Sequence, residues 1–162
     1  MISNRLRLSD IEGLFLGKPI GGGIDRNVYA LKETSAWGWR HKITQAPEVD
    51  DEECRHVIKV QKGHTGYFQN VAEWLLWETA RATRLARWLA PCVAISPCGL
   101  YLIQRRVEPL RRRDLPKRMP TFLSDLKREN FGMLEGKVVC CDYGLGVDAG
   151  AIKTKLRKAR WD

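Results

Sequence analysis

The chain has 162 residues, 44% of them apolar, and a formal net charge of +9 at pH 7. This length predicts one domain, or two small lobes, with enough apolar residues to build a core. The sequence contains no run of about twenty apolar residues, so we expect no membrane-spanning helix. Residues 1–10 are not followed by the apolar stretch of a secretory signal, so we expect none.

The cysteines are odd in number and match no disulfide framework. They are Cys54, Cys92, Cys98, Cys140 and Cys141. No CxxC pair occurs, and the three histidines have no regular zinc spacing. We therefore expect thiols, a reducing cytoplasmic location and no zinc site.

The first half of the chain predicts a small sheet with one main helix. Strands are expected at 14–23, 27–32 and 55–61, and the glycines of 21–23 predict a hairpin turn between the first two. Apolar residues at helical spacing over 67–89 predict one long helix, or two joined helices, that Pro91 ends. Residues 93–95 and 100–103 then predict a strand pair that turns at 97–99.

The second half predicts a smaller set of elements. Residues 105–120 form a basic connector that contains prolines, and 121–126 predict a helical turn. Residues 131–134 and 137–141 predict a hairpin across Glu135-Gly136. The basic tail, 149–161, predicts a short helix. We expect an α+β chain with domains at 1–104, 105–120 (connector) and 121–162.

One stretch in the second half carries polar residues that phosphoryl transfer requires. Residues 125–130 read Asp-Leu-Lys-Arg-Glu-Asn, and Asp142-Tyr143-Gly144 follows after an apolar run. Such a set can supply a carboxylate to orient a hydroxyl, a lysine near the transferred phosphate, and oxygen ligands for magnesium. Upstream lie a glycine-rich turn and, within an apolar strand, Lys59. A lysine in such a strand either pairs with an anion or lies at a sheet edge facing water.

In this order, the parts resemble the protein kinase-like superfamily, including its aminoglycoside phosphotransferase and atypical branches. The resemblance covers residues 14–146. Residues 21–29 resemble the G-x-G-x-x-G-x-V loop, with Arg26 at the third glycine; 125–130 resemble D-L-K-P-E-N; and 142–144 resemble D-F-G. The resemblance implies a five-stranded antiparallel N-lobe sheet with one main helix and a much reduced second lobe.

The resemblance also implies a role for each matching residue. Nucleotide contacts would come from Gly21, Gly22, Gly23, Val28, Lys59, Glu73, Arg106 and Val107. The last two belong to residues 105–108, which by position would be the hinge whose backbone binds adenine in the family. Glu73 or Glu78 would pair with Lys59, and we favour Glu73 from its position in the helix. Asp125 would act as the base and Lys127 as the charge stabiliser. Asn130 and Asp142 would bind Mg²⁺ beside ATP.

Three departures from the family pattern leave the activity open. Leu123-Ser124 replaces the bracing pair before the catalytic aspartate, the two helices normally inserted after the hinge have no room, and only a short tail follows Gly144. We expect either a minimal kinase that modifies a protein or itself, or a non-catalytic module that binds a partner protein. A homodimer could cover what the missing helices normally bury. The short length resembles that of small phage or mobile-element proteins.

The excess positive charge suggests a third function. It lies in two segments, 105–118 and 153–160. Such clusters favour phosphate-bearing or acidic partners, nucleic acid among them, although a basic surface can also serve solubility alone. Aromatic residues do not alternate with these basic residues as a stacking platform requires, with the exception of Trp161.

Overall fold

The computed structural model describes residues 16–23, 25–31, 54–62, 68–144 and 155–162. The chain divides into two compact units, and each is described by itself. The first comprises the described residues of Met1–Trp74 together with Cys92–Arg106; the second comprises Leu75–Pro91 and the described residues of Val107–Asp162. Compared with the expected division at residue 104, the second unit also takes in residues 75–91.

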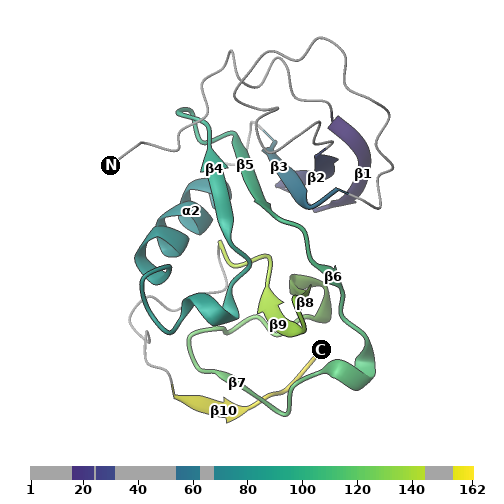
Figure 1. Ribbon diagram of the computed structural model, residues 1–162, viewed down its shortest axis with the longest axis vertical. Coiled ribbons are helices and arrows are strands. Elements are labelled where there is room, and N and C mark those ends of the chain that lie inside the picture. The colour runs from purple at the N-terminus through teal and green to yellow at the C-terminus, as the bar shows by residue number, and fades with distance from the viewer. Residues whose placement is uncertain (1–15, 24, 32–53, 63–67, 145–154) are drawn as a thin grey trace. The chain divides into compact units, whose positions relative to one another are not determined.

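The first unit is built on a five-stranded antiparallel sheet (Figure 1), as the sequence predicted. Its strand order is β1-β2-β3-β5-β4. The strands are β1 (Leu16–Gly22), β2 (Arg26–Leu31), β3 (His56–Gln61), β4 (Cys92–Ile95) and β5 (Tyr101–Arg105). Strand β3 lies at the centre of the sheet, so Lys59 is not the edge-strand lysine of the alternative reading.

The core of this sheet comes from four of its strands. Leu31, Ile58, Ala94 and Ile103 are buried against one another, with Tyr29 and Val60 among the residues packed around them. β-branched and aromatic side chains suit such positions because they pack well on a pleated surface. The sheet therefore provides a rigid frame for the polar residues on β2 and β3.

The region after the third strand contains a shorter helix than the spacing predicted. Helix α2 (Gln69–Ala80) ends at Ala80, so the prediction that Pro91 ends the helix is wrong. Thr83 bonds the Ala80 carbonyl through both its backbone nitrogen and its hydroxyl, at 2.8 Å each, which replaces the next helical hydrogen bonds. The chain then forms a 3₁₀ turn, η2 (Ala86–Trp88). The residues on either side of this turn, Leu85 and Leu89, are buried.

The hairpin predicted in the second unit is confirmed. Strands β8 (Phe131–Leu134) and β9 (Lys137–Cys140) pair with Leu134 opposite Lys137, and β6 (Glu108–Pro109) joins them in the order β6-β8-β9. Glu135 (φ 50°) and Gly136 (φ 74°) make a two-residue turn with positive φ at both positions. Such turns match the twist of paired strands. Ala90 donates to the carbonyl of Cys140, which ties the segment after α2 to this sheet.

Two helical predictions in the second unit are wrong. Residues 121–126 contain no helix, and the 3₁₀ turns lie on either side of them, at η3 (Arg112–Asp114) and η4 (Arg128–Asn130). The described part of the tail forms a strand, β10 (Leu156–Lys158), antiparallel to β7 (Arg118–Pro120). Backbone pairing with a distant segment here outweighs local helix propensity.

The cysteines form no disulfides. All five cysteines lie in the described part of the chain and are present as thiols, and Cys54, Cys92 and Cys140 are buried. Cys141 is only partly buried, and Cys98 is exposed. No helix in the described ranges is long and apolar enough to span a membrane.

Candidate functional site

A buried ion pair joins the central strand of the first unit to its helix. The Lys59 ammonium donates to Glu73 Oε2 at 2.7 Å, and the side chains are 5% and 0% exposed. The alternative partner, Glu78, instead pairs with Arg81 at the surface, at 3.2 Å. The pairing of Lys59 with Glu73 that the resemblance implied is therefore present.

A second cation, which the sequence did not lead us to expect, binds the same carboxylate. Arg26 Nη2 donates to Glu73 Oε1 at 2.9 Å, and Arg26 Nη1 donates to Asn70 Oδ1 at 3.2 Å. Asn70 in turn donates to the backbone carbonyls of Lys59 (3.2 Å) and Leu100 (2.9 Å). The first turns of α2 are thus fixed to β2, β3 and β5. The signal for Arg26 was its position at the third glycine of the loop pattern.

The two cations keep Glu73 ionised. Burial alone raises the pKa of this carboxyl, but the charge of Lys59, then that of Arg26, and hydrogen bonds from both lower its pKa from 4.5 to about 2. The carboxylate therefore carries its full charge at neutral pH. A buried carboxylate held by two cations sets the position of each side chain closely.

The glycine-rich turn is closed by hydrogen bonds around it. Gly22 pairs with Asn27, Gly23 N donates to the Arg26 carbonyl at 2.9 Å, and Lys62 Nζ donates to the Gly23 carbonyl at 2.7 Å. Glycines 21 to 23 are exposed and none has positive φ. A Cβ built at Gly23 meets no heavy atom within 4 Å, so the fold itself does not require a glycine there.

The other predicted nucleotide contacts are Val28, Arg106 and Val107, and each makes different contacts within the protein. Val28 lies opposite Lys59 in the sheet register. Arg106 N donates to the Arg55 carbonyl at 2.9 Å, so the predicted hinge has this amide engaged within the protein. Val107 packs closely on Gly132, where a Cβ would lie 2.3 Å from Val107 Cγ2. An adenine contact at the hinge would have to use backbone groups other than the Arg106 amide.

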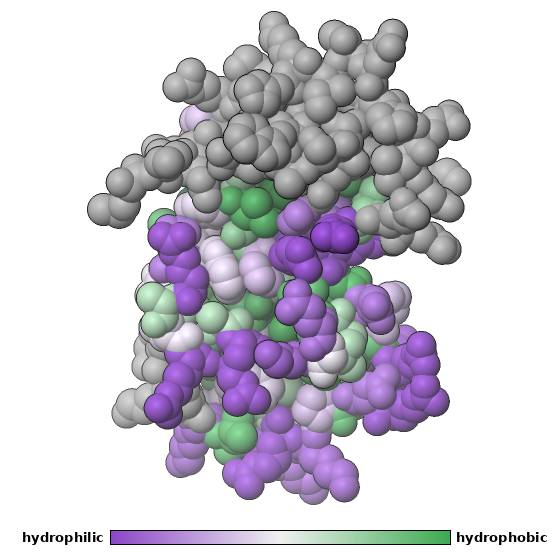
Figure 2. All heavy atoms as spheres, in the orientation of Figure 1, coloured by the Kyte–Doolittle hydropathy of each residue, from purple (hydrophilic) through white to green (hydrophobic). Residues whose placement is uncertain are grey.

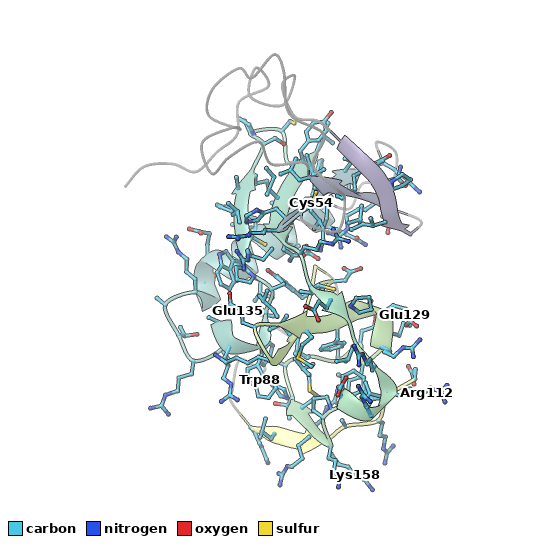
Figure 3. The ribbon with its side chains drawn as sticks, turned by 45° about the vertical axis from the view of Figure 1, so that its right-hand side comes forward. Cys54, Trp88, Arg112, Glu129, Glu135 and Lys158 are labelled. Carbon is cyan, nitrogen blue, oxygen red and sulfur yellow. The ribbon has the colours of Figure 1, made fainter. Side chains whose placement is uncertain are left out.

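In the second unit, the predicted catalytic loop brings three of its polar residues together. Asn130 Nδ2 donates to Asp125 Oδ2 at 2.9 Å, and Lys127 Nζ lies 3.5 Å from the same oxygen. Asn130 N donates to the Lys127 carbonyl at 3.0 Å and closes the turn η4. Glu129, labelled in Figure 3, is exposed on the same turn. The loop thus gathers a carboxylate, an ammonium group and an amide.

The Asp142 segment is joined to this loop through its backbone. The Asn130 carbonyl accepts hydrogen bonds from the amides of Cys141 (2.7 Å) and Asp142 (3.3 Å). Tyr143 is buried, and its hydroxyl donates to the Ala90 carbonyl at 2.8 Å. These bonds hold Asp142, which is exposed, next to Asn130.

The tail holds the loop in place, which we did not expect because residues 149–161 were predicted to form a helix. Arg157 Nη2 donates to the Leu123 carbonyl at 3.0 Å, two residues before Asp125. Asp162 N donates to the Leu126 carbonyl at 3.3 Å, one residue after Asp125. A hydrogen bond from the Arg157 side chain and one from the Asp162 backbone therefore flank Asp125.

The predicted metal ligands, Asn130 and Asp142, are an amide and a carboxylate. Because Asn130 donates through Nδ2, its acceptor atom Oδ1 is the one suited to a cation. Magnesium commonly takes one or two protein oxygens and fills its other positions with phosphate and water. Among the described residues, no cluster of three or more His, Cys, Asp or Glu side chains could hold a metal by itself.

The site residues therefore form two groups, one in each unit. The first joins Lys59, Glu73 and Arg26; the second joins Asp125, Lys127, Asn130 and the backbone of Asp142. No protein-family model matches this sequence, and a search of curated proteins finds no match.

Proposed function

We propose that the protein is a kinase-like phosphotransferase that binds ATP with Mg²⁺ and transfers phosphate to a protein, or to itself. The observation that carries the proposal is the buried pair of Lys59 and Glu73 on the central strand and the helix. A lysine held by a helix glutamate is the arrangement by which kinases place an ammonium group on nucleotide phosphates.

The first unit would bind the nucleotide. Lys59 would contact its phosphates, and the exposed backbone of Gly21, Gly22 and Gly23 would lie close to phosphate oxygens, because glycine has no side chain in the way. The Gly23 amide itself donates to the Arg26 carbonyl and would not be one of the phosphate donors. Val28, on the strand that follows this turn, would contact the base. Arg26 and Asn70 would act as positioning residues, because they hold the carboxylate that holds Lys59.

The second unit would supply the groups for transfer. Asp125 would accept the proton of the attacking hydroxyl while that oxygen bonds to the γ-phosphorus and the bond to the bridging oxygen of ADP breaks. Lys127 would offset charge on the transferred group. Asn130 Oδ1 and the Asp142 carboxylate would hold the metal, which supplies charge neutralisation on the phosphates when bound.

Phosphate transfer from radiolabelled ATP tests the proposal. The wild type should label itself or an added protein substrate in the presence of Mg²⁺, and Asp142→Asn and Asp125→Asn should each lose at least about a hundredfold of this rate. Glu78→Gln, a carboxylate of α2 outside the site, is the matched control and should keep the rate. Absence of both transfer and ATP hydrolysis in the wild type would count against an enzyme.

The burial of Tyr143 favours a second candidate, a non-catalytic module that binds a partner protein. The Tyr143 hydroxyl bonds the Ala90 carbonyl in the interior of the second unit, so the Asp-Tyr-Gly segment also has a structural role that does not depend on catalysis. Such a module would still gain stability from bound ATP. Its biological activity, in contrast to that of a kinase, would be unchanged in Asp125→Asn.

A further inference from the structure

Residues 117–118 and 156–159, which belong to the two basic segments of the sequence, meet in the second unit. The proposed phosphotransfer does not use Lys117, Arg118 or Lys158. Strands β7 and β10 pair with Arg118 opposite Lys158. Ala159 N donates to the Lys117 carbonyl at 2.9 Å, which extends the pairing by one more step. Residues that are about 40 positions apart in the sequence thus place their ammonium and guanidinium groups on one small sheet.

Beside this pairing lies a pocket of about 580 Å³. Its cations are Lys117, Arg118 and Lys158, and its apolar lining includes Leu115, Pro116 and Trp161. The three basic residues are exposed. An apolar pocket with positive groups around it suits a ligand that combines a flat apolar group with phosphate.

The indole of Trp161 is fixed in this pocket. Its Nε1 donates to the Pro116 carbonyl at 2.9 Å, and its ring meets Phe131 edge to face, with ring centroids 4.9 Å apart. The residue remains partly exposed. An aromatic ring that is already held in position loses little freedom when a base stacks on it.

More basic residues surround the pocket. Arg111, Arg112 and Arg113 are exposed at η3, and Lys155 and Arg160 are exposed on the tail. Figure 3 labels Arg112 and Lys158, which extend outward from the second unit, and Figure 2 shows hydrophilic side chains over much of the face around η3 and β7. Three carboxylates lie among these segments: Asp114, 3.9 Å from Arg113, and the exposed Glu108 and Asp162. Positive charge remains in excess.

We propose that this β7–β10 surface binds single-stranded nucleic acid, with phosphates on Lys117, Arg118 and Lys158 and a base against Trp161. Grooves that combine backbone-tracking cations with an aromatic side chain are how proteins bind single strands without sequence preference. An acidic peptide or an anionic lipid surface would use the charge alone, whereas the apolar pocket with its fixed indole favours a ligand with bases.

Fluorescence anisotropy of labelled dT12 and rU12 tests this proposal over 25 to 300 mM salt. Two phosphate contacts contribute about 1.4 to the slope of log affinity against log salt for a single strand. The double variant Lys117→Gln/Lys158→Gln should lower the slope by about this amount and weaken binding about tenfold at low salt. The control Arg84→Gln/Lys137→Gln removes the same charge from exposed residues outside the pocket and should leave both values unchanged.

An abasic strand of the same length tests the indole. The wild type should bind it about tenfold more weakly than dT12, and Trp161→Leu should bind both strands equally. Melting curves, and phosphate transfer at the wild-type rate in the lysine double variant, show that the fold is intact. Absence of strand binding at 25 mM salt, equal losses in the two double variants, or binding to phosphatidylserine vesicles or polyglutamate but not to either strand would each overturn the proposal.

Discussion

The two groups of site residues are held in different ways. In the first unit, the side chains of Lys59 and Glu73 are 5% and 0% exposed, and Arg26 binds the same carboxylate. In the second unit, the side chains of Lys127 and Asp125 are 60% and 40% exposed. The loop and its neighbours are held through backbone carbonyls: that of Leu123 accepts from the Arg157 side chain, that of Leu126 from the Asp162 amide, and that of Asn130 from the Cys141 and Asp142 amides. Buried charges fix a frame and are costly to disturb, whereas exposed charges on a firmly held backbone can meet a ligand at little cost to stability.

Removing the shared carboxylate should have the largest effect on stability. Glu73→Gln leaves Lys59 and Arg26 buried without the anion between them, and we expect a loss of about 3–5 kcal/mol in the free energy of unfolding. Urea denaturation followed by circular dichroism measures it. Glu78→Gln changes a carboxylate of the same helix in a surface pair and should cost at most about 0.5 kcal/mol. Equal losses of unfolding free energy in Glu73→Gln and Glu78→Gln would contradict the larger contribution of the buried carboxylate.

Lowering the pH should weaken the stabilisation that comes from the Glu73 ion pairs. Because the folded protein lowers the pKa of Glu73 from 4.5 to about 2, the unfolded chain takes up the proton first as the pH falls. The contribution of Glu73 is complete above about pH 4.5 and declines as the pH falls toward 2, by about 3 kcal/mol in all. Unfolding free energies measured from pH 6 to 3 should fall more steeply for the wild type than for Glu73→Gln. Parallel curves would show that the lowered pKa is absent.

Two glycine replacements, one in each unit, should change the stability by different amounts. Gly132→Ala would place a Cβ 2.3 Å from Val107 Cγ2 and 2.7 Å from the Glu108 carbonyl, and should cost about 1–3 kcal/mol. Gly23→Ala meets no atom within 4 Å and should leave stability within about 0.5 kcal/mol of the wild type. If the Gly23 backbone approaches phosphate, this variant should nevertheless bind ATP more weakly by isothermal titration calorimetry. A Gly132→Ala protein as stable as the wild type would contradict the close packing of Gly132 against Val107 and Glu108.

The tail contact should have the smallest effect on stability and a clear effect on transfer. Arg157→Met keeps the aliphatic stem but loses the bond to the Leu123 carbonyl, at a cost of about 1 kcal/mol. Because this bond lies beside Asp125, the phosphate-transfer rate should fall while the affinity for ATP stays unchanged. Arg160→Met, an exposed tail residue, should alter neither. A fall in ATP affinity with an unchanged transfer rate would contradict a role for Arg157 in positioning the loop.

The sequence allowed the first unit to be predicted better than the second. Alternating apolar residues and glycine turns, which are local patterns, predicted the five strands. The resemblance to the kinase-like superfamily favoured Glu73 over Glu78 as the partner of Lys59. The β7–β10 pairing, the Arg157 bond and the burial of Arg26 depend on contacts between segments far apart in the chain, which a reading of neighbouring residues does not include. The tail was therefore expected to form a helix.

The melting temperature with ATP, in the presence and absence of Mg²⁺, tests most directly whether the protein binds ATP together with the metal. At about a hundred times its dissociation constant, a ligand contributes about 2.7 kcal/mol, which is several degrees for a chain of this length. We predict such a rise for the wild type with Mg²⁺, a much smaller rise without it, and loss of the Mg²⁺-dependent part in Asp142→Asn. No rise with ATP and Mg²⁺, or an equal rise in Asp142→Asn, would contradict the account.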